Sequence, residues 1–329
     1  MTVRDERPRL ANRDRDITVR NARPVPVAAP ASADDLPRYL RALRRLSNAD
    51  DLAVAYAGCS LAVEVAAREG AAGGLVMAYS ERSSAARRLG DLPAARRDCE
   101  AAAELLEVSG AEPRGATAAL LTSRRIAVRL DLGEIDSADA LLAATPFGGD
   151  DLPDDSEFLL LRYVRGRLHA AAGRPGEGLA DLYHCGERVA ARRSDHPGVL
   201  PWRSAAGLVL TGLGAAEAAE RLVAEEVALT RRHGLASALG RALRIQGQVR
   251  PGLAGMGAAE EAVRVLQGTP RRFERATALV DLGGLLNLAR RRPQARRVLR
   301  DGLELAEQCG APALVARARS YYAGRSPSR

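Results

Sequence analysis

The fold is indicated by a short motif, Gly90-Asp91-Leu92-Pro93-Ala94-Ala95 (GDLPAA), in which a glycine is followed five positions later by a small residue. The same spacing recurs as GEIDSA at Gly133–Ala138, GRPGEG at Gly173–Gly178, GAAEAA at Gly214–Ala219, GAAEEA at Gly257–Ala262, and in a sixth copy with Arg290 in the glycine position and Ala295 in the small position. The copies are 43, 40, 41, 43 and 33 residues apart. Such a period indicates a stack of similar structural units.

Each copy has the residues that a turn between two helices needs. Glycine ends a helix because it adopts a positive φ without steric cost. Proline is suited to the first turn of the next helix and stands there at Pro93, Pro175 and Pro293. The small residue lets the neighbouring helix approach closely. The pattern therefore predicts an all-α protein in which helical hairpins stack, about every 40 residues, into a solenoid.

Apolar residues between these turns follow a helical period. In 293–309 one continuous face carries Ala295, Val298, Leu299, Gly302, Leu303, Ala306 and Cys309. In 92–108 a similar stripe is formed by Ala95, Cys99, Ala102 and Leu106. The first helix of a hairpin, such as Phe273–Leu288, is more apolar all round. We expect these first helices to occupy an inner position, in contact on two sides.

The composition excludes several kinds of chemistry. The chain has 329 residues with a formal net charge of +8, and all 49 basic residues are arginine. Without lysine there is neither a Schiff-base lysine for a pyridoxal cofactor nor a P-loop lysine for nucleotide phosphates. A GC-rich coding bias is the simplest reason for an arginine-only chain. Aromatic residues make up only 3%, and strand-like runs are scarce.

The cysteines and the N-terminus indicate a cytoplasmic protein. Cys59, Cys99, Cys185 and Cys309 form no CxxC pair, so we expect reduced thiols rather than a zinc or redox site. The arginines near the N-terminus are not followed by the apolar segment of a secretory signal. No stretch approaches 18 uninterrupted apolar residues, so no membrane span is expected.

The chain divides into three parts. Residues 1–33 hold seven arginines and four acidic residues, followed by Pro24, Pro26 and Pro30 among small residues, without periodicity, and we expect a disordered basic arm. Residues 34–325 form the predicted helical-repeat solenoid, and 326–329 form a tail. The longest linker, 144–156, is interpreted as a loop within one superhelix that could serve as a hinge between two halves.

Two phrases resemble a known family. They are Leu200-Pro201-Trp202-Arg203-Ser204 (LPWRS) and, after a helix opening with Phe273-Glu274-Arg275-Ala276, the segment Leu303–Ala311 (LELAEQCGA). Over about 160–325, and more weakly over 34–159, the chain resembles the tetratricopeptide-like region of the large ATP-binding LuxR-type (MalT-like) transcriptional regulators of actinobacteria. The resemblance implies a right-handed tetratricopeptide-like solenoid that senses an effector or partner.

The chain departs from that family's pattern at both ends. It has no Walker A sequence, and it stops at Arg329, where the helix-turn-helix domain of the family would begin. We therefore expect neither nucleotide hydrolysis nor direct DNA binding. A separate sensor module, a truncated regulator and a degenerate paralogue all remain open.

Several patterns could suggest a chemical site. Asp150, Asp151, Asp154, Asp155 and Glu157 could bind Ca²⁺, but they lack the alternation of an EF-hand loop, and Asp155 or Ser156 is a natural helix cap. The glycines of 252–257 lack the preceding strand and third glycine of a dinucleotide fingerprint, which favours a turn. The histidines, His169, His184, His196 and His233, form no HExxH motif. We predict no catalytic, cofactor-binding or metal-binding residue.

Arginine pairs recur at 44–45, 87–88, 96–97, 124–125, 192–193, 231–232, 271–272 and 291–292. Residues 290–329 hold ten arginines against three acidic residues, which could form a footprint on nucleic acid. Several pairs lie near helix C-termini, where cations suit the helix dipole, so we interpret them as solvated helix ends. Trp202 follows a proline at a helix start, and we expect it to pack within the fold.

The sequence thus predicts a non-catalytic sensor or interaction module that binds a protein partner or a small effector. Its transcriptional context rests on the resemblance alone. A general protein–protein scaffold and an arginine-rich helical repeat that binds nucleic acid remain as alternatives. The oligomeric state and the identity of the partner stay open.

Overall fold

The computed structural model describes residues 28–108, 112–149, 151–192, 196–250 and 252–323, and these form helices and loops without a strand. The expected basic arm falls mostly, and the tail 326–329 entirely, outside the described residues. The α-helices are α1 (Leu36–Asn48), α2 (Leu52–Arg68), α3 (Ala72–Leu89), α4 (Leu92–Val108), α5 (Ala116–Leu132), α6 (Ile135–Ala143), α7 (Ser156–Ala171), α8 (Pro175–Ala191), α9 (Trp202–Gly212), α10 (Ala216–His233), α11 (Ala236–Val249), α12 (Met256–Gln267), α13 (Arg272–Leu288), α14 (Arg292–Gln308) and α15 (Pro312–Tyr322). Short 3-10 helices span Ala33–Asp35 and Gly252–Gly255.

The predicted turns end the first helix of the hairpins. Gly90, Gly133, Gly173 and Gly214 all adopt positive φ, between 79° and 85°. Arg290 has a φ of 57°, so it takes the glycine position of the sixth copy as predicted. A non-glycine residue in this region carries a steric cost, which here is accepted to keep the hairpin turn.

The fifth copy was placed wrongly. Gly257 lies within the first turn of α12, and the residue with positive φ is Gly252, at 60°. Gly252 follows Gly214 by 38 residues and precedes Arg290 by the same number, so the true period is more regular than the sequence pattern suggested. The small residue of that copy, Ala262, is nevertheless fully buried as expected.

A further copy was missed because its turn residue is not glycine. Asp50, between α1 and α2, has a φ of 69° and lies 40 residues before Gly90. Five positions later Ala55 is buried, as the small residue of the motif should be. Aspartate tolerates the left-handed region better than most residues, which explains why it can replace glycine here.

The helices bury the faces that the periodicity predicted. In α14 the buried residues are Ala295, Leu299, Gly302 and Ala306, and α4 buries Ala95, Cys99 and Ala102. α13 buries residues on nearly all sides, consistent with an inner position. These observations confirm a helical-repeat solenoid built from stacked hairpins.

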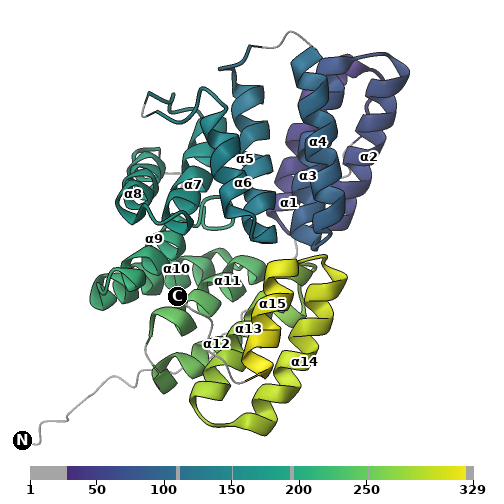
Figure 1. The fold of residues 1–329 in the computed structure, drawn as a ribbon. Coiled ribbons are helices and arrows are strands. Elements are labelled where there is room, and N and C mark those ends of the chain that lie inside the picture. The colour runs from purple at the N-terminus through teal and green to yellow at the C-terminus, as the bar shows by residue number, and fades with distance from the viewer. Residues whose placement is uncertain (1–27, 109–111, 150, 193–195, 251, 324–329) are drawn as a thin grey trace, which may run out of the picture.

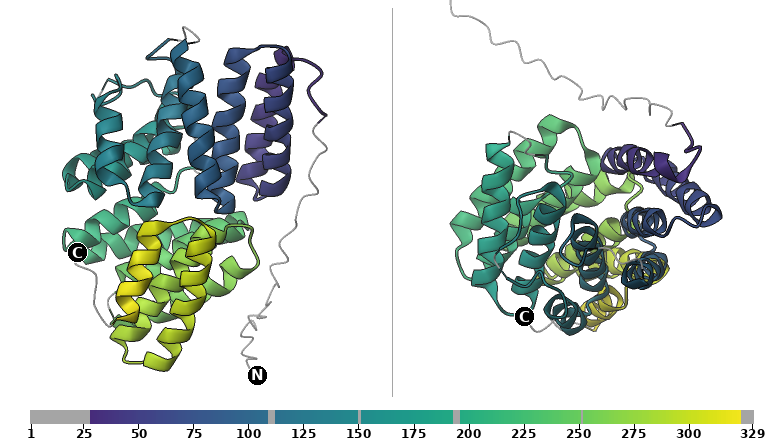
Figure 2. Two further views of the ribbon diagram at one scale, coloured as in Figure 1. Left: turned by 45° about the vertical axis from the view of Figure 1, so that its right-hand side comes forward. Right: turned by 90° about the horizontal axis from the view of Figure 1, so that it is seen from above.

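The hairpins wrap around a common axis, so that the end of the solenoid returns beneath its beginning. α13 to α15 lie below α3 to α5 (Figure 1), and the view from above shows the helices arranged around the axis (Figure 2). The backbone nitrogen of Leu92 donates to the carbonyl oxygen of Cys309 across 3.3 Å. The α5–α6 turn at Gly133 meets Ala313 so closely that a Cβ there would overlap the Cβ of Ala313.

Two buried arginines of α7 anchor the linker 144–156, and Arg162 donates to the carbonyl oxygen of Leu152. Arg165 of α7 donates to the carbonyl oxygens of Phe147 and Gly149, and it also pairs with Asp181 of α8. Phe147 itself is buried against Phe158. The hinge function of this linker stays a prediction. Within the described residues, no helix combines the length and apolar character needed to cross a membrane.

Candidate functional site

A pocket of about 420 Å³ lies on the axis of the superhelix. Its described lining comes from the first helix of six successive hairpins, namely α3, α5, α7, α9, α11 and α13, together with α15, Arg271 just before α13 and the residues just before α9. The second helices of the hairpins contribute none of these lining residues. The solenoid therefore builds the pocket from one equivalent face of successive repeats.

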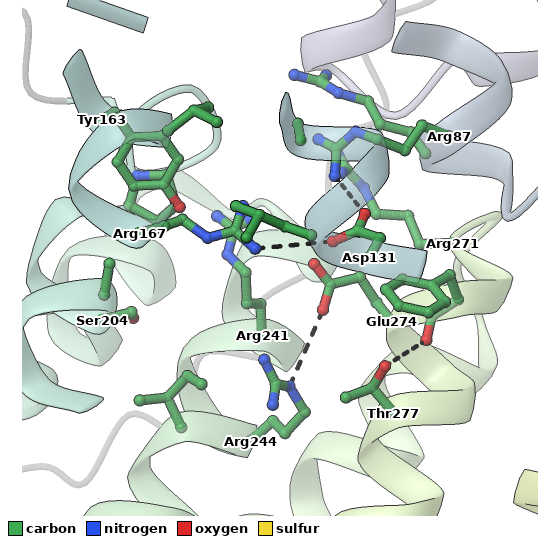
Figure 3. A pocket seen from close by; sticks show the side chains of 18 of the residues that line it. Arg87, Asp131, Tyr163, Arg167, Ser204, Arg241, Arg244, Arg271, Glu274 and Thr277 are labelled. Carbon is green, nitrogen blue, oxygen red and sulfur yellow. Dashed lines mark hydrogen bonds and ion pairs between the residues drawn. The ribbon is translucent and has the colours of Figure 1, made fainter. Parts of the chain in front are cut away.

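Arginine dominates the pocket. Eight arginines line it: Arg87, Arg88, Arg124, Arg167, Arg241, Arg244, Arg271 and Arg317. The only carboxylates among the described lining residues are Asp131 and Glu274. Figure 3 shows these two acids at the centre of the site with Arg87, Arg167, Arg241 and Arg271 directed around them. Apolar wall is supplied by Leu160, Tyr163, Val164, Leu208, Ile245 and Phe273.

One part of the pocket is electrostatically balanced. Asp131 lies 2.6 Å from Arg87 and 3.7 Å from Arg167. Arg244 lies 2.8 Å from Asp281, behind the wall, and 4.0 Å from Glu274. Burial opposes the charged form of Arg167 and Arg244, yet the neighbouring acidic groups raise the pKa of both. Burial raises the pKa of Glu274, but the charges of Arg244, Arg241, Arg271 and Arg87 together lower it below its usual value.

Another part of the pocket lacks this compensation. Arg88 donates only to neutral oxygens, the carbonyl and hydroxyl of Ser47 and the side-chain carbonyl of Asn48. Arg241 donates to the carbonyl oxygen of Pro197 across 2.7 Å. Among the described residues, neither arginine has a carboxylate within 4.0 Å. The two guanidinium groups are thus held in place by neutral acceptors.

The pKa values of Arg88, Arg124 and Arg271 shift in the opposite direction. Burial, with the nearby charges of Arg271, Arg124, Arg87 and Arg241, lowers the pKa of Arg88 well below its usual value. Burial also lowers the pKa of Arg124 and Arg271, although Glu81 and Asp50 respectively act against it. Like charges in a protein interior penalise the charged form, so these arginines favour a counter-anion.

Several buried polar atoms of the lining bond to no other described group of the protein. They are Oγ of Ser204 and Nε of Arg87, Arg124, Arg241, Arg244 and Arg317. Buried donors without a partner carry an energetic cost, and most buried polar groups in proteins are satisfied. The pocket can therefore donate hydrogen bonds to an oxygen-rich ligand.

The interpretation of the arginine pairs as solvated helix ends is wrong for three of them. Arg87 and Arg88, Arg124, and Arg271 point to the axial pocket, and Arg124 and Arg271 are each only 6% exposed. The pair 291–292 is exposed as expected. The sequence did contain a sign of these buried arginines, because they lie on or beside helices that are apolar on all sides. A charged residue on such a helix must be paired or face a cavity.

The acidic cluster near α7 is dispersed among partners of its own. Asp154 pairs with His184 at 3.0 Å and Arg188 at 2.9 Å, while Glu157 lies 3.2 Å from Arg44. Asp155 occupies the N-cap position of α7, without a capping side-chain hydrogen bond, and Asp150 falls outside the described residues. In the described part of the chain, no group of three or more His, Cys, Asp or Glu side chains could hold a metal ion.

The remaining sequence candidates lie away from the pocket lining. His169 bonds to Glu177, and the rings of His196 and His233 lie 5.2 Å apart. Burial, with the charge of His233, lowers the pKa of His196. The glycine-rich segment forms the short helix Gly252–Gly255 and the start of α12, which agrees with a turn.

Trp202 packs within the fold as expected. It is the first residue of α9, 9% exposed, and its indole approaches Gly186 of α8 so closely that a Cβ there would lie 2.7 Å from the ring. Tyr183 packs edge-on against it with ring centroids 6.2 Å apart.

No protein-family model matches the sequence, and no curated protein matches it. Solved structures do. A Rap protein complexed with Competence and Sporulation Factor superimposes with a TM-score of 0.51 at 12% identity, over 88% of this chain and 96% of that one. A tetratricopeptide repeat protein from Parabacteroides merdae gives 0.43 at 13% identity, over 87% of this chain and 99% of that one. The first of these likenesses shows the fold alone, and with the observed hairpins it makes the chain a tetratricopeptide-like helical-repeat solenoid.

Proposed function

We propose that this protein is a non-catalytic sensor or interaction module whose axial pocket binds a protein partner or a small effector. The observation that carries the proposal is the convergence of the first helices of successive hairpins on one pocket whose donors the protein does not satisfy. Solenoids of this kind commonly bind partners on their concave surface. The Rap protein of similar fold was solved in complex with a factor, which supports a binding role.

We further propose a cytoplasmic role in transcription regulation, as part of a LuxR-type system. This proposal rests on LPWRS (200–204) and LELAEQCGA (303–311), which resemble the helical region of those regulators. In the structure the first phrase opens α9 at the pocket, and the second contains the closing contact at Cys309. Co-purification with a helix-turn-helix protein from the native host tests it. A stable complex only with proteins unrelated to transcription favours the general scaffold.

Hydrogen–deuterium exchange tests the binding role. The purified chain is incubated with host extract divided into a small-molecule fraction and a protein fraction. We expect one fraction to slow amide exchange in the inner helices α5, α7 and α11, more than in the outer helices α8 and α10. Protection confined to outer helices, or absent with both fractions, contradicts a ligand in the axial pocket.

A pair of matched variants locates the effect. Ala205 lines the pocket on α9, whereas Ala224 is exposed on α10. Ala205→Trp fills pocket volume and should abolish the protection, while Ala224→Trp should leave it intact. Circular dichroism and the melting temperature establish that both variants fold. Equal protection in the two variants argues against the pocket as the site.

An exposed arginine cluster favours nucleic-acid binding as a second candidate function. Around the start of α14, the exposed residues are Arg290, Arg291, Arg292, Arg296, Arg297 and Arg300. Of these only Arg300 has an ion pair among the described residues, with the adjacent Asp301. A gel-shift assay at two salt concentrations tests this role, since binding through phosphate contacts weakens steeply with salt. No shift at the lower salt concentration rejects it.

A further inference from the structure

The axial pocket carries more positive charge than its surroundings neutralise. Every carboxylate within 4.0 Å of a lining arginine can be counted among the described residues, and there are five: Asp50, Glu81, Asp131, Glu274 and Asp281. Eight guanidinium groups set against these five leave an excess of three positive charges. Glu81 is closer to Arg44, at 2.6 Å, than to Arg124, at 3.7 Å, so the excess felt in the pocket is larger still.

Four of the lining arginines come from four separate elements of the fold. Arg88, Arg124, Arg241 and Arg271 come from α3, α5, α11 and the start of α13. Burial lowers the pKa of Arg88, and the nearby charges of Arg271, Arg124, Arg87 and Arg241 lower it further. Four elements distant in sequence thus bring these cations together, and of the four only Arg124 and Arg271 have a carboxylate within 4.0 Å among the described residues.

The cluster is held in place by contacts that the fold supplies. Arg88 is anchored to the end of α1, Arg241 to Pro197 before α9, and Arg271 to Asp50 in the α1–α2 turn. These anchors involve only part of each guanidinium, which presents up to five N–H donors. Nε of Arg124 and Nε of Arg241 are buried and bond to no described group. The cations are therefore positioned before a ligand arrives, which lowers the entropic cost of binding.

We propose that Arg88, Arg124, Arg241 and Arg271 form an oxyanion-binding site for a small molecule that carries two or three negative charges on phosphate or carboxylate groups. This inference rests on the proposed function and specifies the ligand of that same pocket. The charge of such a ligand matches the excess of three. The planar fork of arginine pairs in a bidentate manner with either kind of oxyanion.

The size and walls of the pocket favour a small molecule over a macromolecule. A volume of about 420 Å³ is within the range of small-ligand pockets and too small for a folded partner. The superhelix closes around the axis through the contact of Leu92 with Cys309. Leu160, Val164 and Leu208 add an apolar wall, so the ligand can carry an apolar portion beside its anionic groups.

Binding of two defined anions tests the site. Pyrophosphate and citrate are titrated separately into the full-length chain by isothermal calorimetry, with the melting temperature recorded at each concentration. Sodium chloride at matched ionic strength is the control. We expect at least one of the two anions to bind with one-to-one stoichiometry and raise the melting temperature, and sodium chloride to do neither. Tighter binding of pyrophosphate identifies a phosphate ligand, and tighter binding of citrate identifies a polycarboxylate.

Three variants assign the binding to the pocket. Arg88→Gln and Arg241→Gln remove cations that have no carboxylate partner, so each variant should fold and each should bind the anion at least about tenfold more weakly, as the loss of a charge-assisted hydrogen bond predicts. Arg297→Gln removes an exposed arginine of the α14 cluster and should bind like the unmodified chain. Loss of binding in Arg297→Gln alone, binding of neither anion, or an equal effect of sodium chloride overturns the proposal.

The outcomes also separate this inference from the proposed function. If the small-molecule fraction of host extract protects the inner helices but neither anion binds, the sensor role stands and the oxyanion ligand is rejected. If an anion binds through Arg88 and Arg241 but no extract fraction protects the inner helices, the oxyanion site stands and the sensor role is rejected.

Discussion

Arg271 donates from Nε to the Oδ1 atom of Asp50 across 2.8 Å, although 221 positions separate the two residues in sequence. Asp50 forms the left-handed turn of the first hairpin, and Arg271 immediately precedes α13. The ion pair thus joins the beginning of the solenoid to its last hairpin, α13–α14. Because Arg271 also lines the axial pocket, one contact connects the closure of the superhelix to the binding site.

Asp50→Asn tests the strength of this closure. Asparagine keeps the left-handed backbone accessible, so the substitution removes the charge and leaves the turn intact. Arg271 then loses its partner while nearly buried, and we expect the free energy of unfolding to fall by about 3 kcal/mol. Urea denaturation monitored by circular dichroism measures the change.

An exposed ion pair provides the control for Asp50→Asn. Glu307 and Arg319 lie 2.9 Å apart at the surface, and Glu307→Gln should cost less than about 1 kcal/mol. Equal losses in the two variants would show that the closing pair contributes no more than a surface pair. The oxyanion proposal adds a second readout, since Asp50→Asn raises the positive excess and should tighten anion binding.

Gly133→Ala and Gly173→Ala separate turn geometry from superhelix closure. The two glycines have nearly the same φ, 80° and 81°, so alanine is strained equally at both. The room for a side chain differs between the two positions. A Cβ atom at Gly173 meets nothing within 4 Å, whereas one at Gly133 overlaps Ala313 of α15. We expect a loss of about 1 kcal/mol at Gly173 from backbone strain, and about 1–3 kcal/mol more at Gly133 from overpacking.

Thermal unfolding of both glycine variants measures this difference. The extra loss at Gly133 should coincide with faster hydrogen exchange in α15, which the closing contact holds in place. Matching stabilities would mean that α15 moves aside without cost and that the superhelix is not closed in solution.

Ala219→Leu probes the small position of the repeat motif. Ala219 is fully buried on α10, where it packs near Gly207 of α9. A leucine at this joint should destabilise the protein by about 1–3 kcal/mol, because the hairpin cannot widen without disturbing its neighbours. Ala224→Leu, on the exposed side of the same helix, should change stability by no more than about 0.5 kcal/mol. Tolerance of leucine at both positions contradicts tight packing of the hairpins.

Local backbone chemistry made most of the architecture predictable. Four glycines correctly predicted the turns that end the first helices, and the small residues Ala95 and Ala219 predicted the close contacts between helices. Asp50 escaped notice because aspartate occupies the left-handed region only when its surroundings require it, which a search for glycine cannot detect. Gly257 misled because its spacing matched by coincidence, while the true turn at Gly252 belongs to a short 3-10 helix.

The axial pocket was less accessible to sequence reasoning, because it depends on how far the superhelix turns. Arg88 and Arg271 are separated by 183 residues, and only the closing of the solenoid brings them to one site. The apolar character of α13 indicated an inner helix, but not which charged residues on such helices would meet. Because a charged residue on an inner helix must be paired or face a cavity, Arg124 and Arg241 could have been predicted as pocket residues.

The four cysteines should be unreactive in the folded protein. All are buried, and burial raises the pKa of Cys185 to about 12 and of Cys309 to about 11. At pH 8 almost no thiolate forms at these sites, and the surrounding side chains exclude the reagent. Ellman's reagent should therefore titrate none of the four thiols in native buffer and all four in denaturant. The folded state keeps the thiol protons at a pH at which the unfolded state loses them. The free energy of unfolding should therefore decrease as the pH rises above the ordinary thiol pKa, about 8.5. A thiol that reacts within seconds in native buffer would show that the hairpin joints at Cys185 or Cys309 open readily, contrary to the close packing on which the pocket depends.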